Sequence, residues 1–214
     1  MRNLLLICFL TIFQFPVNAK SLKGYLEVKK DSNYIESYFN DLVVWMYSGE
    51  KTHSLELNDL NNSYHFRYLP NGYFNMGAGF SYRWFGISLA TKIPIFQNSS
   101  YKHGDTKRFG IQSYIYAGKF SIDILTSFSK GYYLKRSYLY MNSFSKQLEY
   151  QRPDISSSNL GISVNYIFNN SRFSYKAAFS DNEKQKQNAG SLIAGGSIFS
   201  YQTIGDSAFV PSKI

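Results

Sequence analysis

The feature that most constrains the fold of this chain is an alternation of apolar and polar residues with a period of two. It is clearest over residues 73–84, where the odd positions are mostly small or polar. The even positions of that segment carry Phe74, Met76, Ala78, Phe80, Tyr82 and Trp84. Similar alternation covers 86–95, 120–128, 160–168 and 173–179. Because successive side chains of a β-strand point to opposite faces, the pattern predicts strands with one apolar and one polar face.

Less regular segments complete the predicted set of strands. Residues 108–117 and 190–203 predict two further strands, and residues 42–48 and 51–57 predict a first hairpin. No segment predicts a helix, and residues 20–40 favour neither helix nor strand. About nine strands can therefore be predicted, and the expected fold class is all-β.

The predicted connections alternate between short and long. The tight turns are 48–51, 84–86, 118–119 and 169–171, and the long connections are 58–72, 96–107, 130–156 and 181–189. Outer-membrane barrels have short periplasmic turns at one rim and long loops at the other. Strands of about 10 residues, tilted by ~45°, span roughly 23 Å, close to the ~25 Å apolar band. The sequence thus predicts an antiparallel up-and-down transmembrane β-barrel.

The distribution of apolar residues agrees with that prediction. Aromatic residues make up 18% of the chain, which is far too apolar for a disordered protein, yet mean hydropathy is −0.29. After Phe15 the longest apolar run is 42–47, well short of the ~18 residues of a transmembrane helix. Many aromatic residues fall near predicted strand ends, which is typical of an interfacial girdle. A soluble lipocalin-like barrel or sandwich, with an aromatic core, is the alternative.

The first residues predict a secretory signal peptide. Arg2 is followed by the apolar segment 4–15 and by an Ala-x-Ala-like site at Val17-Asn18-Ala19, so cleavage is expected after Ala19. Cleavage removes Cys8, the single cysteine, so the mature protein is expected to form no disulfide and no thiolate metal site. We expect a signal peptide at 1–19, a periplasmic lead-in at 20–40 and an outer-membrane barrel at 41–214.

The strand number raises a question about the C-terminal end. Nine strands are odd, whereas bacterial single-chain barrels have an even number. Gly205-Asp206 predicts another turn, after which residues 207–210 resemble the start of a tenth strand. We therefore expect a complete fold of roughly 10–12 strands, with a barrel domain that is incomplete at the C-terminus.

Several stretches of the sequence are distinctive when taken together. They are Tyr68-Leu69-Pro70-Asn71, Gly77-x-Gly79-x-x-Tyr82-Arg83-Trp84, Tyr116-Ala117-Gly118-Lys119-Phe120, Lys130-Gly131-Tyr132-Tyr133, Phe168-Asn169-Asn170-x-Arg172-Phe173-Ser174-Tyr175 and Gln187-x-Ala189-Gly190-Ser191. They resemble the domain of unknown function 4421 family, a family of exported proteins of Bacteroidetes-type bacteria, and the resemblance covers roughly residues 35–211. The resemblance implies an outer-membrane barrel and a longer C-terminus, and it supplies no activity.

No motif predicts catalysis, a cofactor or a metal site. The histidines are His53, His65 and His103, and none has the spacing to a serine and a third polar group that a lipid hydrolase needs. His103 and Asp105 offer two metal ligands and no third. We expect no enzymatic activity; a lipid-modifying outer-membrane enzyme with a rim histidine, His65 or His103, is the alternative.

The polar face of the predicted strands carries the candidate functional residues. They are Arg83, Lys92, Asp123, Asn165 and Lys176, which should point into the lumen if the apolar face meets lipid. Arg83 and Lys176 could pair with Asp123 and plug a narrow barrel, or line a pore with mild anion preference. Glycines within the strands are expected to mark close packing or curvature; they are Gly77, Gly79, Gly161, Gly195 and Gly196.

The net charge of +9 suggests polyanionic partners. Because an exported chain does not meet nucleic acid, we expect outer-membrane lipid and lipopolysaccharide, with the barrel-assembly machinery during insertion. Basic residues of the long connections could form a lipopolysaccharide-contacting rim: Lys102, Lys107, Lys135, Arg136, Lys146 and Arg152. The expected function is a structural protein or a narrow small-solute pore of the outer membrane; a soluble periplasmic ligand-binding barrel is a further alternative.

Overall fold

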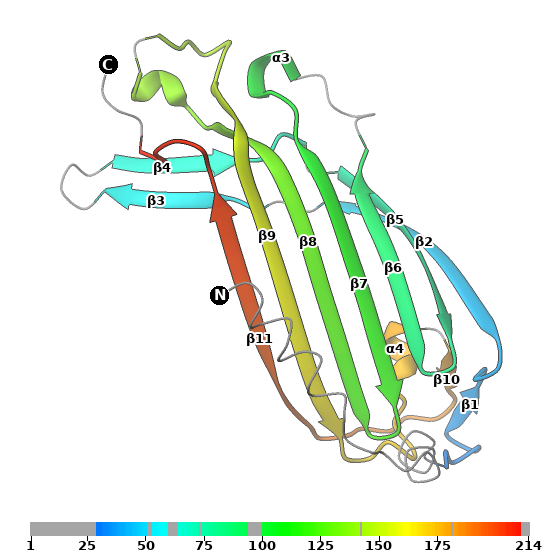
Figure 1. Ribbon diagram of the computed structural model, residues 1–214. Coiled ribbons are helices and arrows are strands. Elements are labelled where there is room, and N and C mark those ends of the chain that lie inside the picture. The colour runs from blue at the N-terminus through cyan, green and yellow to red at the C-terminus, as the bar shows by residue number, and fades with distance from the viewer. Residues whose placement is uncertain are drawn as a thin grey trace, which may run out of the picture.

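The computed structural model describes residues 29–50, 53–59, 64–72, 74–93, 100–141, 143–180 and 182–210 (Figure 1). It is all-β, with 60% of residues in strands and 7% in helices, and its sheets are antiparallel, so this part of the predicted fold is confirmed; the described residues do not form a closed barrel. The predicted signal peptide at 1–19 lies outside the described residues.

One antiparallel sheet of seven long strands dominates the molecule (Figure 1). Its strand order is β11-β9-β8-β7-β6-β5-β2, so neighbours in space are mostly neighbours in the chain. The strands are β2 (Leu42–Glu50), β5 (Phe74–Tyr82), β6 (Phe85–Lys92), β7 (Lys107–Ala117), β8 (Phe120–Leu134), β9 (Tyr150–Ile167) and β11 (Ile193–Ile204). Within the described ranges β2 and β11 each pair with one neighbour only, so the sheet is open between them.

The two faces of this sheet differ sharply in polarity. One face carries large apolar side chains that remain exposed, such as Val44 at 68%, Met46 at 73% and Leu89 at 48%. The opposite face is built from glycine, serine and amide residues with interspersed rings, and Ser81 and Ser121 on it are at most 1% exposed. The alternation along the sequence therefore describes the two faces correctly.

The polar face is strongly concave. The rings of Trp45 on β2 and Tyr114 on β7 stack with centroids 6.3 Å apart, although β5 and β6 lie between their strands. Glycines make room for these rings: a Cβ on Gly79 would lie 2.7 Å from the Trp45 ring, and a Cβ on Gly86 would overlap the Tyr114 ring. Aromatic rings thus lie flat against glycine positions of neighbouring strands and fill part of the concavity.

The two ends of the sheet are built differently. Tight turns at 83–84 and 118–119 lie at one end, called here the turn end. The described parts of two long connections, 100–106 and 135–149 without 142, lie at the other, the loop end. Arg83 adopts φ 57° in its turn, one of two non-glycine residues with positive φ in the described chain. The loop end also carries α3 (Ser100–His103), a 3-10 helix (Ser137–Leu139) and the hairpin of β3 (Leu55–Asp59) and β4 (Tyr64–Leu69).

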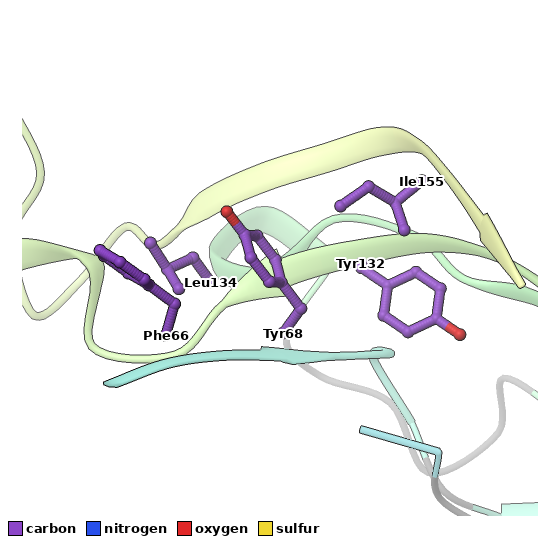
Figure 2. Packing of buried hydrophobic residues seen from close by; sticks show 5 residues of the cluster. All are labelled: Phe66, Tyr68, Tyr132, Leu134 and Ile155. Atoms are coloured by element: carbon purple, nitrogen blue, oxygen red, sulfur yellow. The ribbon is translucent and has the colours of Figure 1, made fainter. Parts of the chain in front are cut away.

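The main buried apolar cluster lies at the loop end rather than between long strands. Figure 2 shows the cluster, in which the β3–β4 hairpin packs its rings against β8 and β9; its residues are Phe66, Tyr68, Tyr132, Leu134 and Ile155. The side chain of Glu149 orders the adjacent connection, because its carboxylate accepts hydrogen bonds from the Ser137 backbone N–H and hydroxyl, both at 2.8 Å. The loop end is therefore a packed structure rather than a set of free loops.

The predicted hairpin of 42–48 and 51–57 is wrong. β2 continues through Ser48 and Gly49 to Glu50 and pairs with β5, while β3 pairs with β4. β4 itself lies inside the predicted connection 58–72. Gly79 of β5 leaves room for the Trp45 ring of β2, and this contact requires β2 to lie beside β5 rather than turn back at Gly49.

The predicted strand at 173–179 is also wrong. The connection from β9 to β11 spans 168–192 and contains α4 (Lys176–Phe179) and β10 (Glu183–Gln185). β10 pairs with β1 (Ile35–Ser37), which lies in the predicted lead-in. This long connection is at the turn end, so the strict alternation of short and long connections breaks there (Figure 1). We call residues 29–41 and 168–192 the turn-end insert.

Candidate functional site

Two of the cavities on the concave face are separated by the turn-end insert. The inner cavity, of about 600 Å³, is bordered by strand residues from β2 to β11 and by Tyr175 and Phe179 of the insert. The turn-end cavity, of about 460 Å³, lies between the insert and the turns of the sheet. Tyr116 and Tyr175 border both cavities, with ring centroids 5.3 Å apart in an edge-to-face contact. The insert thus forms a partition across the turn end of the concave face.

Asp123 and Asn165 lie on the polar face and border the inner cavity. The Asp123 carboxylate accepts a hydrogen bond of 2.8 Å from the Tyr116 hydroxyl. The Asn165 amide nitrogen donates to the Ser121 hydroxyl at 3.1 Å. Both residues are where the alternating pattern predicted them, on the face opposite the large apolar side chains.

Lys92 lies near the loop end of β6 and is separate from the other candidates. Its ammonium group donates to the carbonyl oxygen of Thr106 at 3.1 Å. The Thr106 hydroxyl in turn donates to the carbonyl of Gly131 at 2.6 Å. The hydrogen bond of Lys92 therefore holds the segment that precedes β7 against the end of β6.

Arg83 and Lys176 come together at the turn-end cavity, but not with Asp123. Lys176 belongs to α4 rather than to a strand, and its ammonium group donates to the Arg83 carbonyl at 3.1 Å. Both cations face the Phe39 ring, with Arg83 at 5.7 Å and Lys176 at 5.4 Å from its centroid. Neither Arg83 nor Lys176 forms the predicted ion pair with Asp123. Arg83 lies in the turn between β5 and β6, whereas Asp123 lies on the concave face of the sheet and is hydrogen-bonded to Tyr116.

A third cation, Lys30, borders the same cavity and was not predicted. Its ammonium group donates to the Asn170 side chain at 2.6 Å and lies 3.4 Å from Glu183. Glu183 also accepts a hydrogen bond of 2.6 Å from the Ser174 hydroxyl. These contacts tie the two halves of the insert together. Lys30 and Asn170 are 140 positions apart in the chain, so no local pattern signals their association.

Burial acts on the cations of the turn-end cavity. It lowers the pKa of Lys30, and the nearby carboxylate of Glu183 only partly opposes this effect. Burial also lowers the pKa of Lys176, with Glu183 again opposing it and the charge of Lys30 adding to it. Holding these ammonium groups charged is therefore unfavourable unless negative charge is close.

The histidines at the loop end are engaged in contacts that do not resemble a catalytic site. His65 Nδ1 lies 2.5 Å from the Asn58 side-chain oxygen, and its Nε2 lies 3.8 Å from Glu56. His103 stacks on the Tyr133 ring with centroids 4.2 Å apart. Burial lowers the pKa of His103, and the charge of Lys102 lowers it further. Across the described ranges no group of three His, Cys, Asp or Glu residues could hold a metal ion.

The described chain contains no helix that is both long and apolar enough to cross a membrane. A family model described as a domain of unknown function, DUF4421, matches residues 29–214. No curated protein and no solved structure matches the chain. The family match covers both the sheet and the turn-end insert.

Proposed function

We propose that this chain, which belongs to the domain of unknown function 4421 family, is an outer-membrane protein whose sheet forms the wall of a narrow transmembrane β-barrel. In this proposal the apolar face meets lipid, the polar face lines the lumen, and the turn-end insert occludes the periplasmic mouth. The protein is structural, or passes only small solutes, and has no enzymatic activity.

The inverted polarity of the sheet carries this proposal. A sheet that folds in water buries its apolar face and leaves its polar face exposed. In this protein the side chains with exposed fractions above 40% include Val44, Met46, Leu89 and Phe128, while serines of the opposite face are buried and hydrogen-bonded. An apolar surface of this extent is typical of contact with lipid.

Closure of the barrel needs a further strand that the described residues do not supply. Six antiparallel pairings separate β11 from β2, so these two edge strands run in the same direction. They cannot pair antiparallel with each other, whereas an odd number of additional strands can join them. One such strand would give an eight-stranded barrel, an even number and fewer than the ten to twelve expected from the sequence. The stacking of Trp45 on Tyr114 favours this small diameter.

The lumen of such a barrel would be largely filled. Rings from β2, β7 and β11 lie across the concave face, and Tyr175 and Phe179 enter it from α4. In small barrels side chains fill the interior, so a wide aqueous channel is not expected. We therefore expect unitary conductance in planar bilayers far below that of a general porin.

Heat-modifiable gel mobility tests the proposal directly. The outer-membrane fraction is extracted in detergent and run with and without boiling. A band that shifts on boiling and co-fractionates with outer-membrane lipid is the expected result, because a closed barrel resists the detergent until heated. A band found only in the soluble periplasm, with the same mobility before and after boiling, would overturn the membrane assignment.

A further inference from the structure

We propose that the turn-end cavity binds a phosphate monoester carried on a small ring-bearing molecule. This site goes beyond the proposed barrel, because it requires the folded chain but not insertion into lipid. It is formed by segments that are far apart in the sequence: the insert supplies Lys30, Phe39 and Lys176, and the turn between β5 and β6 supplies Arg83.

The charges around the cavity are not balanced. Lys30, Arg83 and Lys176 face one carboxylate, that of Glu183. Glu183 is already engaged by Lys30 at 3.4 Å and by the Ser174 hydroxyl at 2.6 Å. Within the described residues no carboxylate lies within 4 Å of the Arg83 guanidinium or the Lys176 ammonium group. The Arg83 guanidinium and the Lys176 ammonium group are therefore two positive charges at the cavity to which an anion could bind.

The closest contacts that these two cations make are with neutral groups. Lys176 donates to the neutral carbonyl of Arg83, and Arg83 faces the rings of Tyr82 and Phe39 at 5.1 and 5.7 Å. A ring stabilises a cation far less than an anion at hydrogen-bond distance does. An anion bound near Arg83 and Lys176 would oppose the effect of burial on Lys176 and the repulsion between Lys176 and Lys30.

The backbone of Arg83 adds a second observation. Its φ of 57° is a left-handed conformation that is unfavourable for a residue with a side chain. Glycine would remove that cost at a tight turn, as it does at Gly118, where φ is 58° in the corresponding turn between β7 and β8. An arginine at this position is explained if its guanidinium binds a ligand in the cavity.

Size and lining indicate the chemical class of the ligand. The volume of about 460 Å³ is several times that of a phosphate group and accommodates a monosaccharide-sized molecule beside it. Phe39, Tyr116 and Tyr175 offer ring faces against which a sugar or similar ring can pack. A planar guanidinium paired with an ammonium group suits phosphate, because the guanidinium donates two parallel hydrogen bonds to its oxygens.

Isothermal titration of the detergent-folded full chain tests the proposal, with glucose 6-phosphate, inorganic phosphate and glucose as probes. Glucose 6-phosphate is expected to bind with a Kd that rises with salt, and glucose is expected not to bind. Arg83→Gln and Lys176→Gln should each weaken binding at least tenfold, while Lys92→Gln, which removes a cation at the loop end, should leave the Kd within twofold. Arg83→Lys should restore part of the affinity.

A short-chain phosphatidic acid serves as a second probe for the source of the phosphate. Tighter binding of this lipid than of glucose 6-phosphate would assign the site to a lipid headgroup, and the reverse to a free sugar phosphate. Absence of binding by every phosphorylated probe at millimolar concentration would overturn the proposal, as would equal weakening by Lys92→Gln. Circular dichroism and heat-modifiable mobility of each variant show that it is folded, so failure of this site is distinguishable from failure of the barrel.

Discussion

Gly195 and Gly196 are adjacent in β11, but only Gly195 has neighbouring atoms too close to leave room for a side chain. A Cβ on Gly195 would overlap the carbonyl oxygen of Val164 and the side chain of Asn165 on β9, whereas a Cβ on Gly196 would meet nothing within 4 Å. Gly195→Ala should therefore destabilise the folded protein by about 1–3 kcal/mol, because backbone atoms must move apart. The midpoint of urea unfolding in detergent, followed by tryptophan fluorescence, measures the effect.

Gly196→Ala is the matched control for that substitution. It should change the free energy of unfolding by no more than about 0.5 kcal/mol, since the added methyl group points into open space. Equal destabilisation by both substitutions would contradict the register of β11 on β9. The sequence analysis predicted close packing or curvature at both glycines; close packing is found at Gly195 and not at Gly196.

His103 should titrate below its ordinary pKa of 6.5. Burial against the Tyr133 ring disfavours the imidazolium form, and the neighbouring charge of Lys102 acts in the same direction. Because the folded state binds a proton less readily than the unfolded state, the stabilising contribution is complete above pH 6.5 and is lost as the pH falls from 6.5 through the folded pKa. Proton NMR of the His103 ring measures the midpoint.

Tyr133→Ala provides the comparison for His103. Removing the ring exposes the imidazole, so its midpoint should move up toward 6.5. A midpoint at or above 6.5 in the unaltered protein would show that the stacked arrangement is not maintained in solution.

At the scale of elements, the ion pair of Lys30 and Glu183 is expected to hold the two halves of the turn-end insert together. Glu183 is 6% exposed, and breaking such a buried pair costs about 3–5 kcal/mol. Glu183→Gln should therefore release the β1–β10 pairing while leaving the long strands intact. Hydrogen exchange should increase over residues 31–38 and 183–186 and remain unchanged over β7 and β8.

Glu36→Gln is the control within the same two-stranded sheet. Glu36 is exposed and takes part in no ion pair among the described residues, so its substitution should leave the exchange rates unchanged. Slow exchange of the insert in Glu183→Gln would show that apolar packing, not the ion pair, holds it in place.

Elements with many regular repeats of the period-two pattern could be predicted from the sequence, and short ones could not. β5, β6 and β8 begin within one residue of their predicted starts, because each has several successive apolar positions. The segment 173–179 was misassigned since Tyr175 and Phe179 are four positions apart, a spacing that suits both a strand face and a helix face. The Ser174 hydroxyl, which accepts a hydrogen bond from the Ala177 backbone N–H, is the local signal that favours the helix.

The candidate site was predictable only where it depends on alternation. Asp123 and Asn165 were assigned correctly to the polar face because each lies within a long strand. The grouping of Arg83 with Lys176 around Phe39 depends on how the insert folds back, which no repeat in the sequence encodes. Lys30 and Glu183 meet through the pairing of two three-residue strands, too short to give a period.

At the scale of the whole molecule, one substitution on the apolar face tests whether that face contacts lipid. Leu89 is central on β6 and 48% exposed. In water, Leu89→Lys would change stability by about 0.5 kcal/mol or less, as for most exposed positions. Near the midplane of a bilayer, a lysine on the lipid face costs about 2–4 kcal/mol. The variant should therefore fold much less efficiently into lipid vesicles than the unaltered protein.

Leu139→Lys is the control, since Leu139 is 59% exposed but lies in the 3-10 helix at the loop end, outside the proposed membrane band. It should insert into vesicles as well as the unaltered chain. If both variants insert equally well, Leu89 does not face lipid and the apolar face must instead be covered by protein. If Leu89→Lys alone fails to insert into vesicles, the apolar face contacts lipid. Lipid on that side of the sheet would explain both why its apolar side chains are exposed and why the serines of the opposite face are buried.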